Sequence, residues 1–392
     1  MSKRVGGFIN QDGLNAPDPA TGVEASAGDG QAEVSFTAPS NVGGSAVTGY
    51  VATSNDGISA TGSSSPITVS GLSNGTSYTF NVWAINPFGW SSPSYASGSV
   101  TPAFSRAIFY GSDSASTAIS YVDISTLGNT ADFGDQTLER YNQSACSSAT
   151  RSVCAGGYAV PSYTPTNVID YITIASTGNA TDFGDLTRVT FDAAGAANDT
   201  RGLFLGGSSA GLFNTIAYIT IASTGNATDF GDLSQNVYRN AGCASTTRAL
   251  SMGGGAGGYT NVISYVTINT TGNSTDFGDL SVGRQSGGAV SSSTRGVYAG
   301  GDQGTGTNII EFVTLATTGN ATDFGDLTVA TRNAISGASS KTRGLFGFNQ
   351  GTAHTEYITI ASTGNAATFG TLTAGGMSSC SSGTSSNHGG LS

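Results

Sequence analysis

One short phrase recurs along most of the chain and constrains its fold more than any other feature. A phenylalanine, followed in five of six cases by Gly-Asp, stands at positions 133, 183, 230, 277, 324 and 369. The successive steps are 50, 47, 47, 47 and 45 residues. Periods of this length belong to folds built from repeated units. Because Ile, Val, Tyr and Thr surround each phenylalanine, every unit is predicted to consist of strands.

The fullest repeat begins at Thr200 and predicts four strands, at 203–205, 216–222, 229–233 and 240–244. Four antiparallel strands form one blade of a β-propeller. A second marker, an arginine near the start of each unit, gives the same number of repeats. These arginines are Arg106, Arg151, Arg201, Arg248, Arg295 and Arg343. The sequence therefore predicts an all-β chain with a six-bladed propeller over residues 103–392.

The two ends of the repeat region complement each other. The first arginine lacks the small polar strand that precedes every other one, whereas GGMSSCSSGTSS follows Leu372 without a blade of its own. We align Cys380 with Cys146, and Ser385 with Arg151. The C-terminal strand is therefore predicted to close the first blade, which removes exposed sheet edges.

The repeat also resembles a known family. A double glycine after one strand, a tyrosine in the next, a later aromatic residue and an arginine opening the following unit are similar to kelch repeats. The kelch tryptophan position is occupied here by the repeated phenylalanine, which can still fill the seam between blades. The resemblance implies a kelch-like propeller.

Residues 17–102 form a separate module in the sequence. The segment GLSNGTSYTFNVWAIN resembles the tyrosine corner of a fibronectin type III domain, in which Leu72 fills the core and the Tyr78 hydroxyl folds back to the loop. Inward-facing residues are expected at alternate positions: Val34, Phe36, Ile67, Val69, Tyr78, Phe80, Val82 and Ala84. The first 16 residues precede this β-sandwich and read either as a docking arm or as a disordered terminus.

Composition limits the possible partners. The formal net charge is −11 and only 10% of the residues are charged, so a nucleic acid is an unfavourable partner. No stretch approaches the roughly 18 apolar residues of a membrane span. The N-terminus lacks the apolar core of a secretory signal, which predicts that the protein, if it leaves a cell, does so without a standard leader. Cys146 and Cys154 could form a disulfide, but buried thiols are expected.

The sequence offers few candidates for a catalytic centre or a metal site. Asp residues flank the repeated phenylalanine in five repeats. A structural role in turns is expected for them, with calcium binding left open, because a catalytic centre needs one asymmetric cluster. His354 and His388 have no second ligand at metal-binding spacing. We therefore predict a non-enzymatic protein without a metal or cofactor.

The loops after the double glycine differ from repeat to repeat, whereas the STGNATD loop is nearly constant. Strand alternation places the variable loops on one face, here called the variable-loop face, together with the loops after FGDL. The STGNATD loops and SSTTR turns form the opposite, constant-loop face. Variable loops on a fixed scaffold indicate a binding face, although exposed loops also drift without function. The predicted ligand-binding residues are Tyr158, Tyr163, Phe213, Tyr259, Asp302, Gln303, Asn349 and Gln350.

Taken together, the N-terminal arm, the fibronectin-like module and the repeats resemble virion proteins of marine tailed bacteriophages. That resemblance implies a tail-fibre or appendage component on the virion surface, which is homo-oligomeric and binds a host surface glycan or protein. The arm and the fibronectin-like module would contact other virion proteins. Two alternatives stay open: a spacer or capsid decoration protein without receptor binding, and a propeller enzyme acting on polysaccharide.

Overall fold

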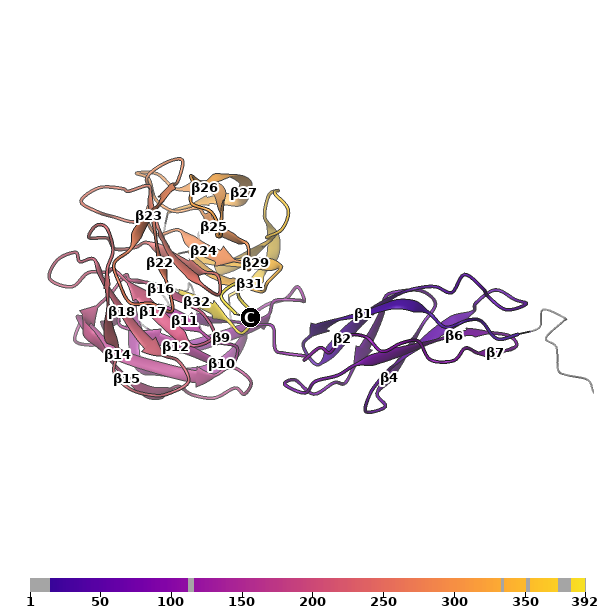
Figure 1. Cartoon of the computed structure of the whole chain (residues 1–392). Coiled ribbons are helices and arrows are strands. Elements are labelled where there is room, and N and C mark those ends of the chain that lie inside the picture. The colour runs from indigo at the N-terminus through magenta and orange to yellow at the C-terminus, as the bar shows by residue number, and fades with distance from the viewer. Residues whose placement is uncertain (1–14, 112–115, 333–334, 350–352, 373–381, 392) are drawn as a thin grey trace, which may run out of the picture. The chain divides into compact units, whose positions relative to one another are not determined.

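The computed structural model describes residues 15–111, 116–332, 335–349, 353–372 and 382–391. Within these residues the regular structure consists of β-strands, paired in antiparallel sheets, which confirms the all-β prediction. The chain divides into two compact regions between Phe104 and Ser105 (Figure 1). The predicted arm lies almost entirely outside the described residues. No described helix could cross a membrane.

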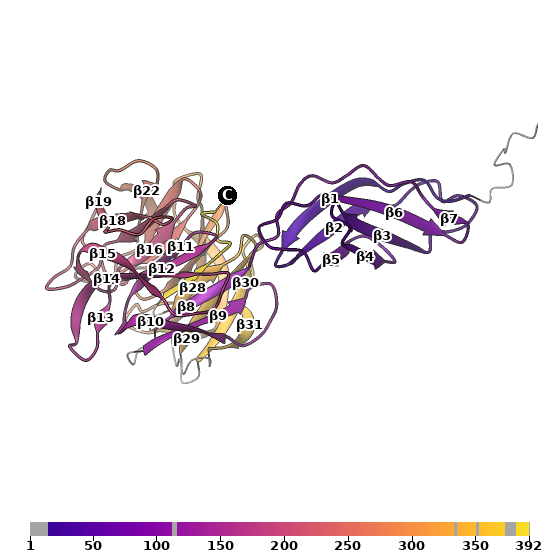
Figure 2. The same cartoon turned by 90° about the horizontal axis from the view of Figure 1, so that it is seen from below.

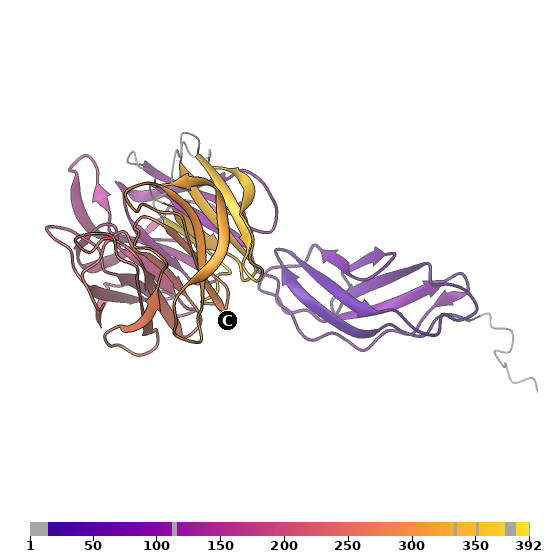
Figure 3. The same ribbon diagram turned by 90° about the horizontal axis from the view of Figure 1, so that it is seen from above.

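The N-terminal region contains two antiparallel sheets that enclose one apolar core (Figure 3). One sheet has the order β1 (Thr21–Gly28), β2 (Gln31–Thr37), β5 (Ile67–Ser70). The other has the order β4 (Ser59–Gly62), β3 (Gly49–Ser54), β6 (Phe80–Asn86), β7 (Gly89–Trp90).

The expected inward-facing residues of this region are all buried, from Val34 to Ala84. The backbone N–H of Ser73 donates a hydrogen bond of 3.0 Å to the Tyr78 hydroxyl. Leu72 is buried beside it in the same core. Both predictions for the tyrosine corner are therefore confirmed.

Four sheets of the C-terminal region have four strands each and follow the chain in order. They are β16 (Ala194–Ala197), β17 (Arg201–Leu205), β18 (Thr215–Thr220), β19 (Thr228–Asp232); β20 (Ala241–Ala244), β21 (Arg248–Met252), β22 (Val262–Thr267), β23 (Thr275–Asp279); β24 (Gly288–Ser291), β25 (Arg295–Ala299), β26 (Thr307–Thr314), β27 (Thr322–Thr331); and β28 (Ser336–Ser339), β29 (Arg343–Asn349), β30 (Ala353–Thr359), β31 (Ala367–Thr371). We call these the third to sixth repeats.

A nine-stranded sheet contains the first two repeats. The first consists of β32 (Ser382–Ser385), β8 (Arg106–Tyr110), β9 (Ser116–Asp123) and β10 (Ala131–Tyr141). The second consists of β11 (Ser144–Ser147), β12 (Arg151–Ala155), β14 (Thr164–Thr173) and β15 (Thr181–Thr190). The short strand β13 (Tyr158–Ala159) pairs with both β10 and β14 and joins the two repeats.

The inner strands of the repeats form a closed ring. Each of β11, β16, β20, β24, β28 and β32 lies next to the following one, and β32 also lies next to β11. Figure 2 shows the early strands β8 and β9 beside the C-terminal strands β30 and β31. This arrangement is compatible with a β-propeller.

The C-terminal strand pairs with β8 as expected, but its predicted register was wrong by four residues. Ser385 pairs with Ala107, in the same way that Ser147 pairs with Ser152. Ser385 therefore occupies the position of Ser147 and not that of Arg151. The alignment failed because it matched identical Ser and Cys letters, whereas the register is set by the small side chains that fit the ring axis.

One set of contacts repeats around the ring. In each repeat an arginine lies over an aromatic ring, at 4.5 to 4.9 Å from its centroid. That ring meets the repeated phenylalanine edge-on at 5.7 to 6.0 Å. The same arginine donates to a backbone carbonyl of the next repeat, as Arg151 does to Ile221. Arg343 of the last repeat donates to Ile124 of the first at 2.8 Å, which completes the circle.

The constant STGNATD loop makes a second set of hydrogen bonds between repeats. The Asn226 side-chain oxygen accepts a hydrogen bond of 3.0 Å from the Asp185 N–H of the preceding repeat. Equivalent bonds join the other repeats, through Asn179, Asn273, Asn320, Asn365 and, across the closure, Asn129. The Asp residues beside the phenylalanine are expected in these turns, but the side chains that accept the hydrogen bonds between repeats are these asparagines.

Ending the chain at Leu372 removes β32 and leaves one edge of β8 unpaired. We expect the whole C-terminal region to unfold earlier, with a Tm lower by about 10 °C or more in calorimetry. A chain ending at Ser386 keeps β32 and is the control. An unchanged Tm for the shorter chain would contradict closure by β32.

Replacing Asn226 with Ala removes one of these hydrogen bonds between repeats, on an exposed loop. The loss of one such bond corresponds to about 1 kcal/mol and a Tm lower by about 2–4 °C. Thr224→Ala in the same loop is the control and should leave the Tm unchanged. Equal Tm shifts for the two variants would argue against a stabilising hydrogen bond of Asn226.

Candidate functional site

The variable loops are anchored to the neighbouring repeat at their first residue. Tyr158 pairs with Tyr141, Ser208 with Phe191, and Gly255 with Tyr238. Only the tips of these loops are therefore free to vary without loosening the ring.

Two of the predicted ligand-binding residues are packed against the protein. Tyr158 stacks on Tyr141 at 5.4 Å and lies 4.2 Å from the Phe191 ring, between two repeats. Phe213 is only 7% exposed and packs under the Arg188 guanidinium at 3.9 Å. Both side chains stabilise the scaffold in this structure.

Other predicted residues reach solvent. Tyr163 and Tyr259 are 66% and 44% exposed. The Tyr259 hydroxyl donates to Asp302 at 3.1 Å, and Arg332 pairs with the same carboxylate at 3.1 Å. Burial tends to raise the pKa of Asp302, but hydrogen bonds from Arg332, the Gly304 N–H and Tyr259 outweigh it and hold that pKa below its ordinary value.

The remaining predicted residues are half-buried or lie outside the described part of the chain. Gln303 is half-buried in the loop that contains Asp302. Gln350 and the side chain of Asn349 lie outside the part of the chain that the structure describes. Ligand binding by this set of residues stays a prediction.

A pocket of about 470 Å³ opens at the centre of the ring, on the variable-loop face. Its wall is made by the starts of the inner strands and by the residues just before them. The polar lining residues are Asn142, Gln143, Ser144, Asp192, Arg239, Asn240, Ser286, Ser336 and Ser382. Small Ala and Gly residues fill most of the remaining wall.

The mouth of this pocket is bordered by residues in the left-handed backbone region. Asn142, Asp192, Arg239 and Ser286 have φ between 53° and 59°. The N–H of each later residue donates to the carbonyl of the one before it, at 2.8 to 2.9 Å. Such a conformation costs free energy for residues other than glycine, and the chain of backbone bonds holds it in place.

Two features give the pocket its chemistry. Asp192 and Arg239 form an ion pair of 3.0 Å at the mouth. Burial raises the pKa of Asp192, while Arg239 opposes that effect. Gln143 is 2% exposed, and both polar atoms of its carboxamide lack a hydrogen-bond partner among the described residues.

The sequence reading missed this pocket. A signal was present, because the loops after FGDL also differ between repeats: Tyr-Asn-Gln at 141–143, Phe-Asp-Ala at 191–193 and Tyr-Arg-Asn at 238–240. Polar residues at equivalent positions converge on the axis only when the ring closes.

Below the pocket the channel narrows. A Cβ on Gly195 would lie 1.9 Å from the Ala145 carbonyl oxygen, so the inner strands tolerate only the smallest residue there. A cavity of about 50 Å³ follows. Serine hydroxyls then link neighbouring inner strands, as Ser147 does to Ser385 at 2.7 Å and Ser339 does to Ser291 at 3.0 Å.

The C-terminal residues close the far end of the channel. The His388 Nε2 bonds the Ser147 carbonyl at 2.8 Å, and its Nδ1 accepts from the Gly390 N–H at 3.1 Å. The Gly389 N–H donates to Ser291 on another inner strand. Because one ring nitrogen must accept, this arrangement requires a neutral imidazole.

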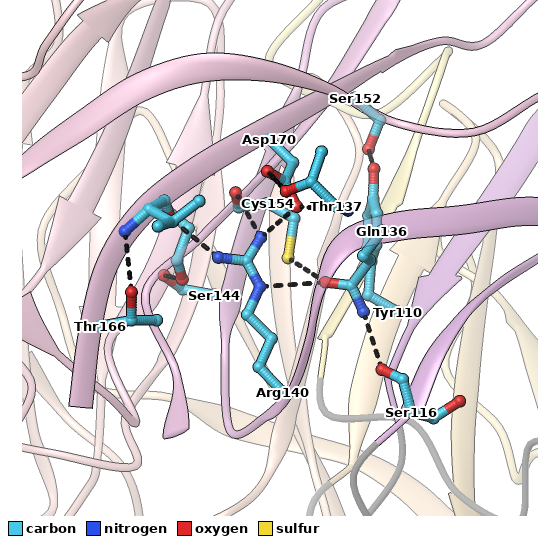
Figure 4. Close-up of polar contacts among 12 residues, drawn as sticks. Tyr110, Ser116, Gln136, Thr137, Arg140, Ser144, Ser152, Cys154, Thr166 and Asp170 are labelled. Carbon is cyan, nitrogen blue, oxygen red and sulfur yellow. Dashed lines mark hydrogen bonds and ion pairs between the residues drawn. The ribbon is translucent and has the colours of Figure 1, made fainter. Parts of the chain in front are cut away.

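A buried ion pair joins the first two repeats (Figure 4). Arg140 and Asp170 are both fully buried and 2.8 Å apart. The Arg140 guanidinium also donates to Gln136 and to backbone carbonyls, and Thr137 donates to the carboxylate. With its charges paired and closed off from solvent, the cluster fixes the contact between repeats and presents no open position for a substrate.

The cysteines of the described region are free thiols. Cys146 pairs with Val153 and Cys154 with Ala145, so the two sulfurs point to opposite faces of the sheet. Burial raises the pKa of Cys154 and of Cys243 to about 12. The expected buried thiols are confirmed, and these cysteines are poor nucleophiles.

No cluster of three metal-binding side chains occurs among the described residues. No protein-family model and no curated protein matches this chain.

The neutral imidazole predicts a pH dependence of stability. Burial lowers the pKa of His388, and the bond to Ser147 offsets only part of that effect. Below about pH 6.5 the histidine of the unfolded chain binds a proton, whereas that of the folded chain stays neutral. The free energy of unfolding therefore decreases as the pH is lowered, until the pH reaches the lowered pKa of His388 in the folded chain.

Urea unfolding between about pH 5 and pH 7 measures this effect. His388→Asn should lower the pH slope of the unfolding free energy by up to about 1.4 kcal/mol per pH unit. His354→Asn is the matched control. An unchanged slope in the His388 variant would contradict a neutral His388 imidazole in the folded chain.

Proposed function

We propose that the chain is a fibronectin type III-like sandwich joined to a six-bladed kelch-like β-propeller. It serves as a non-enzymatic virion surface component of a tailed phage, a tail-fibre or appendage protein that binds a host surface glycan or protein. Sheets of three and four strands with a tyrosine corner support the first assignment. A closed ring of four-stranded repeats supports the second.

One observation supports the binding function: the side chains of one face bond within the ring, whereas aromatic side chains of the other face are exposed to solvent. On the constant-loop face, the recurring asparagines are bound to the neighbouring repeats and His388 closes the channel. On the variable-loop face, Tyr163 and Tyr259 are exposed, and a pocket opens on the same face at the ring axis. Exposed aromatic side chains are common anchors for proteins and sugars.

A second role, as a spacer or decoration protein, is favoured by exposed aromatic residues of the N-terminal region. Phe88, Trp90 and Tyr95 are 45%, 58% and 97% exposed. Single surface aromatics need no partner, but three within eight residues suit attachment to another virion protein. This alternative has no receptor binding, so a binding measurement separates it from the first role.

The binding role is tested by replacing Tyr163 and Tyr259 with Ala and measuring retention of the purified protein on envelope glycans or cells of marine bacteria. Truncating an aromatic anchor typically costs about 2 kcal/mol, so we expect roughly 30-fold weaker binding. Both side chains are exposed, and the variants should fold normally.

Tyr95→Ala removes an equally exposed tyrosine from the other region and is the control. Retention that depends on Tyr95 and not on the two loop tyrosines would assign the binding to the N-terminal region. Retention that depends on none of the three would leave the spacer role.

A further inference from the structure

We infer that the variable-loop face binds an acidic glycan, one whose sugar units carry carboxylates, through the Arg332 guanidinium and the Tyr259 ring. This inference rests on the proposed function, because both side chains lie on the proposed binding face. It adds the chemical class of the ligand and gives Arg332 a role in recognising it.

One carboxylate holds the two side chains in place. One oxygen of Asp302 accepts from the Tyr259 hydroxyl at 3.1 Å, and the other accepts from the Arg332 Nε at 3.1 Å. The Gly304 N–H also donates to this carboxylate, at 3.0 Å. Tyr259 belongs to the fourth repeat and Asp302 to the fifth, and Arg332 follows β27. Tyr259, Asp302 and Arg332, here called the Arg332 cluster, therefore form a preformed surface across neighbouring repeats.

The stem of Arg332 packs on the loop that contains Asp302. A Cβ on Gly306 would lie 2.8 Å from the Arg332 Cγ. Gly306 is not in the left-handed backbone region, so the close approach of Arg332 is what requires a glycine there. The Arg332 side chain is nevertheless 53% exposed. Its stem is therefore fixed while its guanidinium reaches solvent.

The outer end of the Arg332 guanidinium is open to a ligand. Its Nε bonds with Asp302, and neither Nη atom has a hydrogen-bond partner among the described residues. Other arginines of the ring use these atoms: Arg151 donates through Nη1 to two backbone carbonyls, and Arg140 donates through both Nη atoms. Two parallel Nη N–H groups match the two oxygens of a carboxylate. The free end of Arg332 is therefore suited to a carboxylated ligand.

A second arginine of this face has the same arrangement. The Arg239 Nε pairs with Asp192, and the two side chains are 40% and 10% exposed. The Arg332 and Asp302 side chains are 53% and 14% exposed. Burial lowers the pKa of Arg239, but the charges of Asp192 and Asp302 raise it, so the two pairs lie within electrostatic reach of each other. In both pairs the positive group faces solvent and the negative group is covered, which favours an anion.

The net charge of −11 does not oppose an anion at this place. Two Asp residues in each of five repeats lie beside the constant loops, as Asp185 does. Asp326 precedes Arg332 by six residues, or about 20 Å along an extended strand. Charges in physiological salt are screened beyond about 8 Å. The acidic constant-loop face therefore has little effect on a ligand at the Arg332 cluster.

Tyr259 favours a sugar over a simple anion. Its ring is 44% exposed, and the bond from its hydroxyl to Asp302 fixes the ring in place. A fixed aromatic ring offers a flat apolar surface on which a sugar ring packs. Exposed ion pairs contribute little to stability, so a purely structural role explains the Arg332 cluster poorly.

The experiment is calorimetric titration of the full chain with trigalacturonate, its methyl ester and poly-L-glutamate. The methyl ester keeps the sugar rings without the charge, whereas poly-L-glutamate keeps the carboxylates without the rings. We expect trigalacturonate to bind with a Kd of about 1 mM or lower. The other two compounds should bind about tenfold more weakly or less, because each lacks one of the two contacts.

Two substitutions of Arg332 test its role. Arg332→Gln should weaken trigalacturonate binding about tenfold or more, because it removes the charged pair of donors. Arg332→Lys keeps the charge and should still weaken binding, since an ammonium cannot present two parallel N–H groups. Lys341→Gln removes one positive charge from an exposed residue of the constant-loop face and is the matched control. All three variants should keep the Tm within about 2 °C.

Trigalacturonate binding that is unaffected by Arg332→Gln, or weakened equally by Lys341→Gln, overturns the inference. Equal or tighter binding of the methyl ester or of poly-L-glutamate overturns it as well. Tyr163 lies outside the Arg332 cluster and separates the inference from the proposed function. If trigalacturonate does not bind while Tyr163→Ala still weakens retention on envelopes, the inference is wrong and the proposed function stands. If Tyr163 and Tyr259 also have no effect on retention, both are wrong.

Discussion

Each repeat of the C-terminal region depends on its neighbours, and closure of the ring is the constraint on which the rest of the structure depends. An arginine that stacks on its own repeat also bonds a carbonyl of the next, as Arg151 does with Ile221. An asparagine from each following repeat bonds back, as Asn226 does. The chain satisfies these bonds everywhere only because β32 and Arg343 join the last repeat to the first.

Closure explains why one face is constant in sequence and the other is not. The STGNATD loops must keep their asparagine, because it accepts the N–H of the preceding repeat. The variable loops pair with the neighbouring repeat at their first residue, and the exposed side chains at their tips can change. Closure also brings Gln143, Asp192 and Arg239 from three repeats to one axis, where they form a single polar pocket.

Much of this could be predicted from the sequence, and the failures have physical causes. Strands at period two, the buried Phe series and the Tyr78 hydrogen bond follow from local patterns. The register of Ser385 did not, because it depends on which side chains fit the crowded axis. Phe213 and Tyr158 looked like free loop aromatics, yet tertiary packing covers them. Gln143 lies in a loop that varies between repeats, but its convergence with residues of distant repeats follows only from closure of the ring.

The central claim is that the variable-loop face contacts the host surface while the constant-loop face holds the ring together. Hydrogen–deuterium exchange of the full chain, with and without bound envelope glycan, tests it most directly. The account predicts slower exchange at residues 141–144, 158–163 and 255–260, with no change in the STGNATD loops. Protection confined to residues 176–181 and 223–228, or to the N-terminal region, would contradict it.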